Sequence, residues 1–188
     1  MRVPVDLRRC TRLLNHGPTT LISAAANGQR NVMAAAWVMP LDFAPPKLAV
    51  VVAEDTHTRS LVEASGELVV AVPTFAQLAL VDAVGSSTGR EVDKFAALSI
   101  ASSPGSLVAA PLIDGCAAWL ECRVIPEPHL QSAYDLFAVE VIAAWADDRI
   151  FDGARLRDDL PDDLRSVHHL AGGHYALTGR LVAARSSG

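Results

Sequence analysis

Residues 19–38 read TTLISAAANGQRNVMAAAWV and contain the clearest structural signal in the chain. Two apolar segments, 19–26 and 31–38, flank the dipeptide Asn27-Gly28. Asn-Gly is favoured in two-residue hairpin turns because both central positions of a type I′ turn need a positive φ. This stretch therefore predicts a strand, a tight turn and a second strand that pairs with the first.

The rest of the chain continues in short strands with a few helices between them. Further strands are predicted where short apolar runs stand between turn residues: 48–53, 68–72, 118–124 and 136–145. Helices are predicted where capping residues open a segment: 56–66, 74–83 and 88–95. Strands and helices do not alternate regularly, so the pattern favours a mainly β, mostly antiparallel barrel with helical insertions over a Rossmann sheet. Residues 152–169 are charged and predict a surface excursion.

Composition limits the classes of protein to consider. The chain has 188 residues, of which 51% are hydrophobic, and we expect a single domain, with a lead-in at 1–10 and a tail at 180–188. The formal net charge of −5 argues against nucleic-acid binding. Three cysteines cannot form a disulfide framework, and no signal peptide is evident, which predicts a cytoplasmic protein. No apolar run is long enough to predict a transmembrane helix.

Three consecutive alanines, Ala34 to Ala36, give the second strand an unusually small surface. A planar group could lie there and contact the backbone, although a strand packed against a bulky neighbour would show the same residues. Residues 56–58, Thr-His-Thr, place hydroxyls and free amides at a predicted helix start, which suits an anion or a plain N-cap.

Residues 86–95 read SSTGREVDKF and combine hydroxyls, a glycine, Arg90 and Lys94. This set suits a phosphate site, but it lacks the order of a P-loop and equally suits two capped helices with a solvated charged face. Because Lys94 follows Arg90 by four residues, both side chains would share one face of a helix. His168, His169 and His174 have no second ligand cluster at metal-binding spacing, so no metal site is predicted.

Four segments together resemble one known family. Residues 31–40, 85–95, 110–124 and 169–175 are similar, in this order, to the signatures of the flavin reductase-like, FMN-binding split-barrel family that includes flavoredoxin. The resemblance spans about residues 10–178. It implies a six-stranded Greek-key split barrel, usually dimeric, with one FMN near the dimer interface.

The resemblance also implies which residues bind the cofactor. By this analogy the flavin ring is edged by residues of the second strand: Asn31, Val32, Met33, Ala34, Ala35 and Trp37. The phosphate and ribityl chain fall to residues at the helix start and in the 86–95 segment: Thr56, His57, Thr58, Ser86, Arg90, Lys94 and Phe95. FMN carries a dianionic phosphate and a large planar ring, and these residue types match both parts.

The function implied by the resemblance is NAD(P)H-dependent flavin reduction, in which hydride passes from nicotinamide to flavin. No dedicated catalytic acid or base is expected, because the cofactor carries the chemistry. Electrons could pass on to free flavin, to ferric iron or to a partner oxygenase. Two alternatives remain open from the sequence: an electron carrier of the flavoredoxin kind, and an FMN-binding module without turnover.

Overall fold

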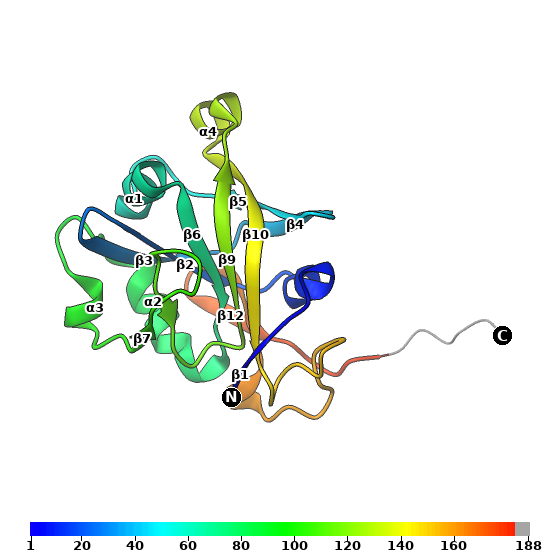
Figure 1. The fold of residues 1–188 in the computed structure, drawn as a ribbon. Coiled ribbons are helices and arrows are strands. Elements are labelled where there is room, and N and C mark those ends of the chain that lie inside the picture. The colour runs from blue at the N-terminus through cyan, green and yellow to red at the C-terminus, as the bar shows by residue number, and fades with distance from the viewer. Residues whose placement is uncertain (183–188) are drawn as a thin grey trace.

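The computed structural model describes residues 1–182, which build one long, curved antiparallel sheet (Figure 1). Its strands are hydrogen-bonded in the order β3 (Gln29–Ala35), β2 (Thr20–Ala26), β6 (Glu67–Val72), β9 (Ala118–Ile125), β10 (Leu136–Asp147), β5 (Pro46–Val51) and β4 (Val38–Phe43). An eighth strand, β1 (Arg2–Pro4), pairs with the far end of β10. The two ends of the order, β3 and β4, are consecutive in the chain, so the sheet curls back toward itself.

The predicted hairpin is confirmed. Ala26 pairs with Gln29 across a two-residue loop, in which Asn27 has a φ of 52° and Gly28 a φ of 76°. Both values lie in the left-handed region that a type I′ turn requires. The hairpin fixes the register of β3, which positions the small residues discussed below.

Alternation along the strands separates two hydrophobic cores. Ile22, Val70 and Ala35 point into the barrel, where they join a large buried cluster. Leu21 and Val32 point to the outer side, where helices and the 98–116 segment cover a second cluster. Because successive side chains of a strand face opposite ways, β2, β3, β6 and β9 serve both cores at once.

Short helices and strands cover the sheet. The helices are α1 (His57–Ser65), α2 (Leu78–Gly85), α3 (Lys94–Ala97) and α4 (Pro128–Tyr134), with 3₁₀ turns η1 (Leu7–Leu13), η2 (Phe75–Gln77) and η3 (Asp162–Leu164). The small strand pairs are β7 (Ser102–Ser103) with β8 (Leu112–Ile113), and β11 (Val167–Ala171) with β12 (His174–Leu177). Figure 1 shows α2, α3 and β7 on one side of the sheet, β4 extending on the opposite side, and α4 projecting beyond the ends of β9 and β10.

The structure differs from the sequence-based expectation at several elements. The sheet has eight strands, two more than the six predicted: the second strand ends at Ala35 and a separate strand, β4, begins at Val38, and β1 is the other addition. Pro45 lies in the β4–β5 turn, and Pro46 opens β5.

The first ten residues are a packed part of the fold and not a lead-in. Arg2–Pro4 form β1, and the 3₁₀ turn that follows buries Cys10 completely. The sequence did not predict this packing, because polar and basic residues stand between the apolar positions Val5, Leu7 and Cys10. Of the predicted tail at 180–188, residues 183–188 lie outside the part of the chain that the structure describes.

Candidate cofactor site

The start of α1 is a capped helix end with free backbone amides. Thr56 caps the helix: its Oγ1 accepts a hydrogen bond from the Arg59 amide at 3.2 Å and donates to the Ala53 carbonyl at 2.8 Å. The amides of His57 and Thr58 lie in the first turn, where no intrahelical acceptor exists. These amides and the helix dipole favour a negative charge at this point.

Asn31 connects the end of β3 to this helix. Its buried side chain donates from Nδ2 to Thr58 Oγ1 at 3.0 Å. Gly89 lies directly against the same side chain, since a Cβ at this position would come within 2.3 Å of Asn31 Oδ1. The 86–92 loop can therefore approach β3 this closely only because residue 89 is a glycine.

Arg90 extends from this loop to the start of α1, where its Nε donates to the Asp55 carbonyl at 3.3 Å. Arg90, His57 and Gly89 line an open cleft of about 630 Å³, which also runs along the β2–β3 turn and includes Arg30. We call it the Arg90 cleft. The guanidinium of Arg30 lies 4.1 Å from the centre of the Phe95 ring, so that Phe95 supports the cleft from the second core.

Acidic residues also reach the Arg90 cleft, among them Glu91 and Asp93. The carboxylate of Asp93 is engaged as the N-cap of α3, where Oδ1 accepts from the amides of Phe95 and Ala96 at 3.0 and 3.2 Å. Arg30 and Arg90 therefore share the cleft with two carboxylates, of which that of Asp93 is hydrogen-bonded to backbone amides of α3.

Lys94 does not join Arg90 in the cleft. Its side chain is 3% exposed, and Nζ donates to the carbonyls of Val32 at 3.0 Å and Val84 at 2.7 Å. Burial lowers the pKa of this ammonium. The expectation that Arg90 and Lys94 share a helix face is wrong, because α3 begins only at Lys94 and Arg90 lies in the preceding loop.

The second half of the site is a pocket of about 290 Å³ over the small residues that follow Asn31. We call it the alanine pocket. Ala34, Ala35 and Ala36 line it along the strand, between two walls. One wall is the last turn of α2 with Asp82, Gly85 and Ser86; the other is the β11–β12 hairpin with His169, Gly173 and Tyr175. Ser86, expected at the phosphate, lies here instead.

The Arg90 cleft and the alanine pocket lie at opposite ends of β3. Ala35 follows Asn31 by four positions along the strand, which corresponds to a distance of about 13 Å. An elongated ligand that follows the strand would place one end at the helix start and the other over the alanines. Val32 and Met33, which lie between the two ends, point into the two cores, so they can support such a ligand mainly through their backbone.

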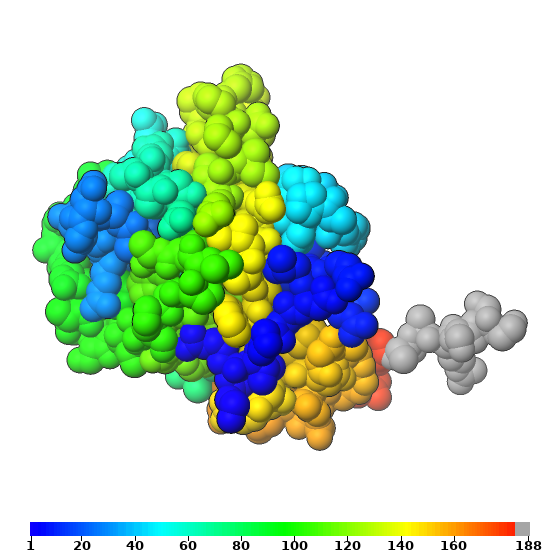
Figure 2. Space-filling view, viewed as in Figure 1, coloured from blue at the N-terminus to red at the C-terminus, as the bar shows by residue number. Residues whose placement is uncertain are grey.

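Trp37 lies outside both cavities. It is 74% exposed and, just before β4, begins a stripe of exposed large apolar side chains that continues along β4 with Met39, Leu41 and Phe43. A groove of about 310 Å³ runs beside the stripe between β4, β5 and Leu136, and Ala36 is shared with the alanine pocket. Figure 2 shows the β4–β5 turn, in cyan, standing out from the body of the molecule.

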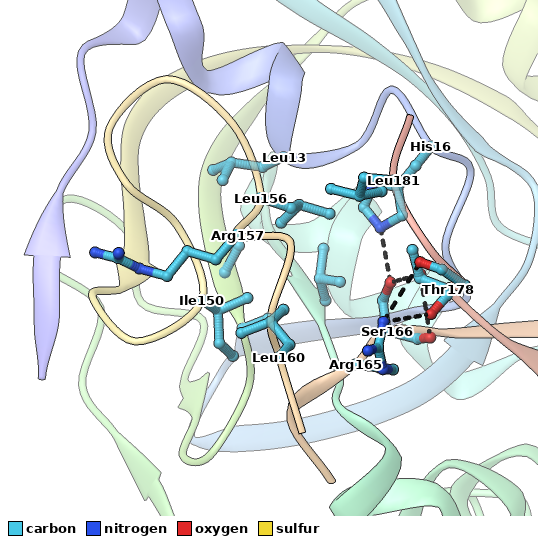
Figure 3. Close-up of a pocket in the computed structure, with 14 residues that line it drawn as sticks. Leu13, His16, Ile150, Leu156, Arg157, Leu160, Arg165, Ser166, Thr178 and Leu181 are labelled. Carbon is cyan, nitrogen blue, oxygen red and sulfur yellow. Dashed lines mark hydrogen bonds between the residues drawn. The ribbon is translucent and has the colours of Figure 1, made fainter. Parts of the chain in front are cut away.

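A third, enclosed cavity lies between η1, the 150–165 loop and the end of β12 (Figure 3). It is mostly apolar and has only about 20 Å³ of free space, enough for a water molecule. At its polar end His16 Nε2 and Ser166 Oγ lie 2.9 Å apart, and Ser166 bonds in turn to Thr178. This network ties the C-terminal strand to η1 and is too tightly packed for a cofactor.

No second chemistry competes with this site among the residues described. Within residues 1–182, no group of three or more His, Cys, Asp or Glu side chains is arranged to hold a metal ion. The three cysteines are free and buried, and burial raises the pKa of Cys10 to about 11 and of Cys116 to about 12. Within the same residues, no helix combines the length and the apolar character needed to cross a membrane.

Several residues of the two cavities were not singled out from the sequence. Arg30 and Asp82 looked like ordinary surface charges of a hairpin turn and a helix. Tyr175 belongs to the closing motif at 169–175, but only the fold shows that this segment pairs back as a hairpin and reaches the alanine pocket. The only feature of the sequence that pointed to this segment was the run Gly172-Gly173-His174-Tyr175.

Comparison with known proteins places this geometry in context. Residues 13–158 match the family model described as the flavin reductase like domain. The chain is 41% identical over 185 residues to the uncharacterized protein YddH of Escherichia coli (strain K12), and the alignment covers 97% of each chain.

Two solved structures share the fold over most of their length. An FMN-binding domain of a flavin reductases-like enzyme from Shewanella baltica OS155 is 45% identical, with a TM-score of 0.95 over 98% of this chain and 97% of that one. The flavoredoxin of Methanosarcina acetivorans is 26% identical, with a TM-score of 0.74 over 90% and 89% of the two chains. The predicted split barrel is thereby confirmed, and this chain belongs to the flavin reductase-like domain family.

Proposed function

We propose that this protein binds FMN along β3 and catalyses NAD(P)H-dependent flavin reduction. One observation carries the proposal: a cleft that holds two arginines beside a helix start and a pocket lined by three alanines lie at the two ends of the same strand. FMN has the matching form, with a dianionic phosphate at one end of a ribityl chain and a planar ring at the other. The Shewanella baltica relative is itself described as FMN-binding.

The residues present fit the phosphate of FMN. Arg90 and Arg30 supply positive charge in the Arg90 cleft, while the amides of His57 and Thr58 supply donors at the start of α1. The close approach of Gly89 to Asn31 keeps a side chain out of the space between them. Lys94 supports this end from behind, because it joins β3 to the last turn of α2.

The alanine pocket fits the ring. Three methyl-sized side chains leave the backbone of β3 accessible to a flat group, and the walls of α2 and the β11–β12 hairpin limit the access of water. When bound, FMN supplies hydride acceptance from the nicotinamide. The task of the chain is then to hold the two rings in contact and in orientation, for which no general acid or base is required.

The same proposal includes a homodimer formed through β4. Three large apolar side chains of this edge strand, and that of the residue just before it, are more than half exposed: Trp37, Met39, Leu41 and Phe43. Such a stripe on an edge strand is characteristic of an interaction surface. Because Ala36 borders both the β4 groove and the alanine pocket, a partner subunit seated on β4 would lie beside the ring site.

Two further functions use the same site. An electron carrier of the flavoredoxin type would take electrons from a protein, and a binding module would hold FMN without turnover. We favour the reductase because the Shewanella baltica relative, 45% identical to this chain, is described as a flavin reductases-like enzyme. Free flavin, ferric iron or a partner oxygenase would then receive the electrons, in the cytoplasm.

Anaerobic mixing of the FMN-loaded protein with NADH or NADPH tests the proposal. We expect the visible absorption of the bound flavin to bleach with one equivalent of at least one nucleotide, and the protein to oxidise NAD(P)H catalytically when acceptor flavin is added. A protein that binds FMN but stays yellow with both nucleotides would be a carrier or a binding module. A protein that binds no FMN would contradict the proposal entirely.

A further inference from the structure

Tyr175 and Asp82 face the alanine pocket from opposite walls. Tyr175 lies on β12, and its ring packs partly buried against the second core. Asp82 lies on the exposed side of α2. Both residues line the pocket above Ala34 and Ala36, together with His169 and Ser86. The polar groups of the pocket are therefore arranged around the alanines.

The two side chains offer complementary hydrogen-bonding groups. Burial, assisted by the negative charge of Asp82, raises the pKa of the Tyr175 phenol, so this group remains a neutral donor at physiological pH. Asp82 carries an acceptor-only carboxylate. The His169 ring meets the Tyr175 ring edge to face, with centroids 5.2 Å apart, which holds the phenol in place over the pocket.

A primary carboxamide has the inverse of this pattern. Its carbonyl oxygen accepts one hydrogen bond and its NH₂ group donates two, whereas a carboxylate only accepts. A ring that carries a carboxylate would bring a second negative charge toward Asp82, and like charges disfavour binding.

We propose that Asp82 and Tyr175 are the residues that recognise the carboxamide of the nicotinamide ring, with Asp82 accepting from its NH₂ group and Tyr175 donating to its carbonyl oxygen. This inference rests on the proposed function and adds to it the residues that bind the carboxamide of the substrate. His169 acts as a positioning residue through Tyr175. The pair makes the site select a nicotinamide over the corresponding nicotinic acid.

Equilibrium binding of two mononucleotides tests the assignment without turnover. The oxidised, FMN-loaded protein is titrated by calorimetry with nicotinamide mononucleotide and with nicotinic acid mononucleotide. We expect the wild type to bind the amide about tenfold more tightly than the acid. Asp82→Asn should reduce this preference to within about twofold, mainly by improving the affinity for the acid. Tyr175→Phe should weaken both ligands, because both offer an acceptor oxygen to the phenol.

Asp159→Asn is the matched control. It makes the same change of charge on the exposed 152–164 segment and does not line the pocket, so it should keep the tenfold preference. An unchanged preference in Asp82→Asn, or no binding of either mononucleotide to the FMN-loaded wild type, would overturn the assignment. The proposed function fails separately, if the protein binds no FMN or if NAD(P)H leaves the bound flavin oxidised.

Discussion

Single buried charges hold the walls of the site in place. Glu121 is completely buried, and its carboxylate accepts hydrogen bonds from the Ser106 and Leu107 amides at 2.9 and 2.7 Å and from Trp145 Nε1 at 2.8 Å. Burial alone would raise the pKa of Glu121, but these donors hold it below its usual value. Period-2 alternation could not predict this role, because the donors come from the 106–107 loop and from β10.

Lys94 is the cationic counterpart of Glu121, and its role is structural. Lys94→Met keeps most of the aliphatic chain but removes both hydrogen bonds, leaving two buried carbonyls without a donor. We expect a loss of about 2–4 kcal/mol in the free energy of unfolding, measured by urea denaturation. The affinities of the variant for FMN and for riboflavin should fall to a similar extent. Selective weakening of FMN with unchanged stability would instead place the ammonium at the phosphate.

His16 predicts a pH dependence of stability. Burial lowers its pKa to about 4, with a smaller contribution from His168. The unfolded chain has an ordinary histidine pKa near 6.5, so it takes up a proton first as the pH falls. The stabilisation from neutral His16 is therefore complete above pH ~6.5 and is lost between pH ~6.5 and ~4, by about 1 kcal/mol for each pH unit.

His16→Asn provides the comparison for this prediction, because the amide can still bond to Ser166 but does not titrate. Urea unfolding of both proteins from pH 7 to pH 4 should show the wild type losing stability faster than the variant. Parallel curves for the two proteins would show that His16 is protonated equally in the folded and unfolded states.

At the scale of elements, the sequence predicted the hairpin, the six strands and α1 because local rules determine them. The Asn-Gly turn, the period-2 alternation and the Thr56 cap all act within a few residues. Among the features that were not predicted are the start of α3 at Lys94, the separate strand β4, the helix α4 and the strand β1. The strand β1 depends on a tertiary contact, the pairing of Arg2–Pro4 with β10. The start of α3 depends on a local cap, Asp93, which competed with the capping box expected at Thr88.

The close approach of the 86–92 loop to β3 can be tested by adding a single methyl group at Gly89. Gly89→Ala would drive a Cβ into the Asn31 side chain and so displace either the loop or the Asn31–Thr58 hydrogen bond. We expect FMN affinity to fall about tenfold while circular dichroism remains native. Gly179→Ala is the control, since nothing lies within 4 Å of its added Cβ. Native affinity in Gly89→Ala would show that the loop does not shape the site.

At the scale of the whole molecule, the apolar stripe on β4 predicts a dimer. Leu41→Lys places a charge in the stripe, and we expect light scattering to show a monomer at micromolar concentration where the wild type is dimeric. Leu107→Lys is a matched control, because Leu41 and Leu107 are both 53% exposed but only Leu41 lies on β4. A monomeric wild type, or equal dissociation of both variants, would refute an interface through β4.

The two ends of the site were predictable to different degrees. The small surface at 34–36 and the capped helix start at 56–58 could be predicted from residue types, because alanines and a capping hydroxyl have these structural effects locally. The partition of the 86–95 segment could not: Ser86 faces the alanine pocket, Arg90 the Arg90 cleft and Lys94 the protein interior. The helix expected over 88–95 begins only at Lys94, and this difference of a few residues changes the direction of each of these side chains.

The central claim is that FMN lies along β3 with its phosphate in the Arg90 cleft. The most direct measurement compares the affinities of flavin-free protein for FMN and for riboflavin, which lacks the phosphate, in the wild type, in Arg90→Ala and in Arg155→Ala, a remote arginine paired with Asp158. We predict that Arg90→Ala weakens FMN about ten- to a hundredfold, the worth of one charged hydrogen bond, and riboflavin less than about twofold. Arg155→Ala should change neither. Equal weakening of both flavins by Arg90→Ala, or no preference of the wild type for FMN, would contradict the account.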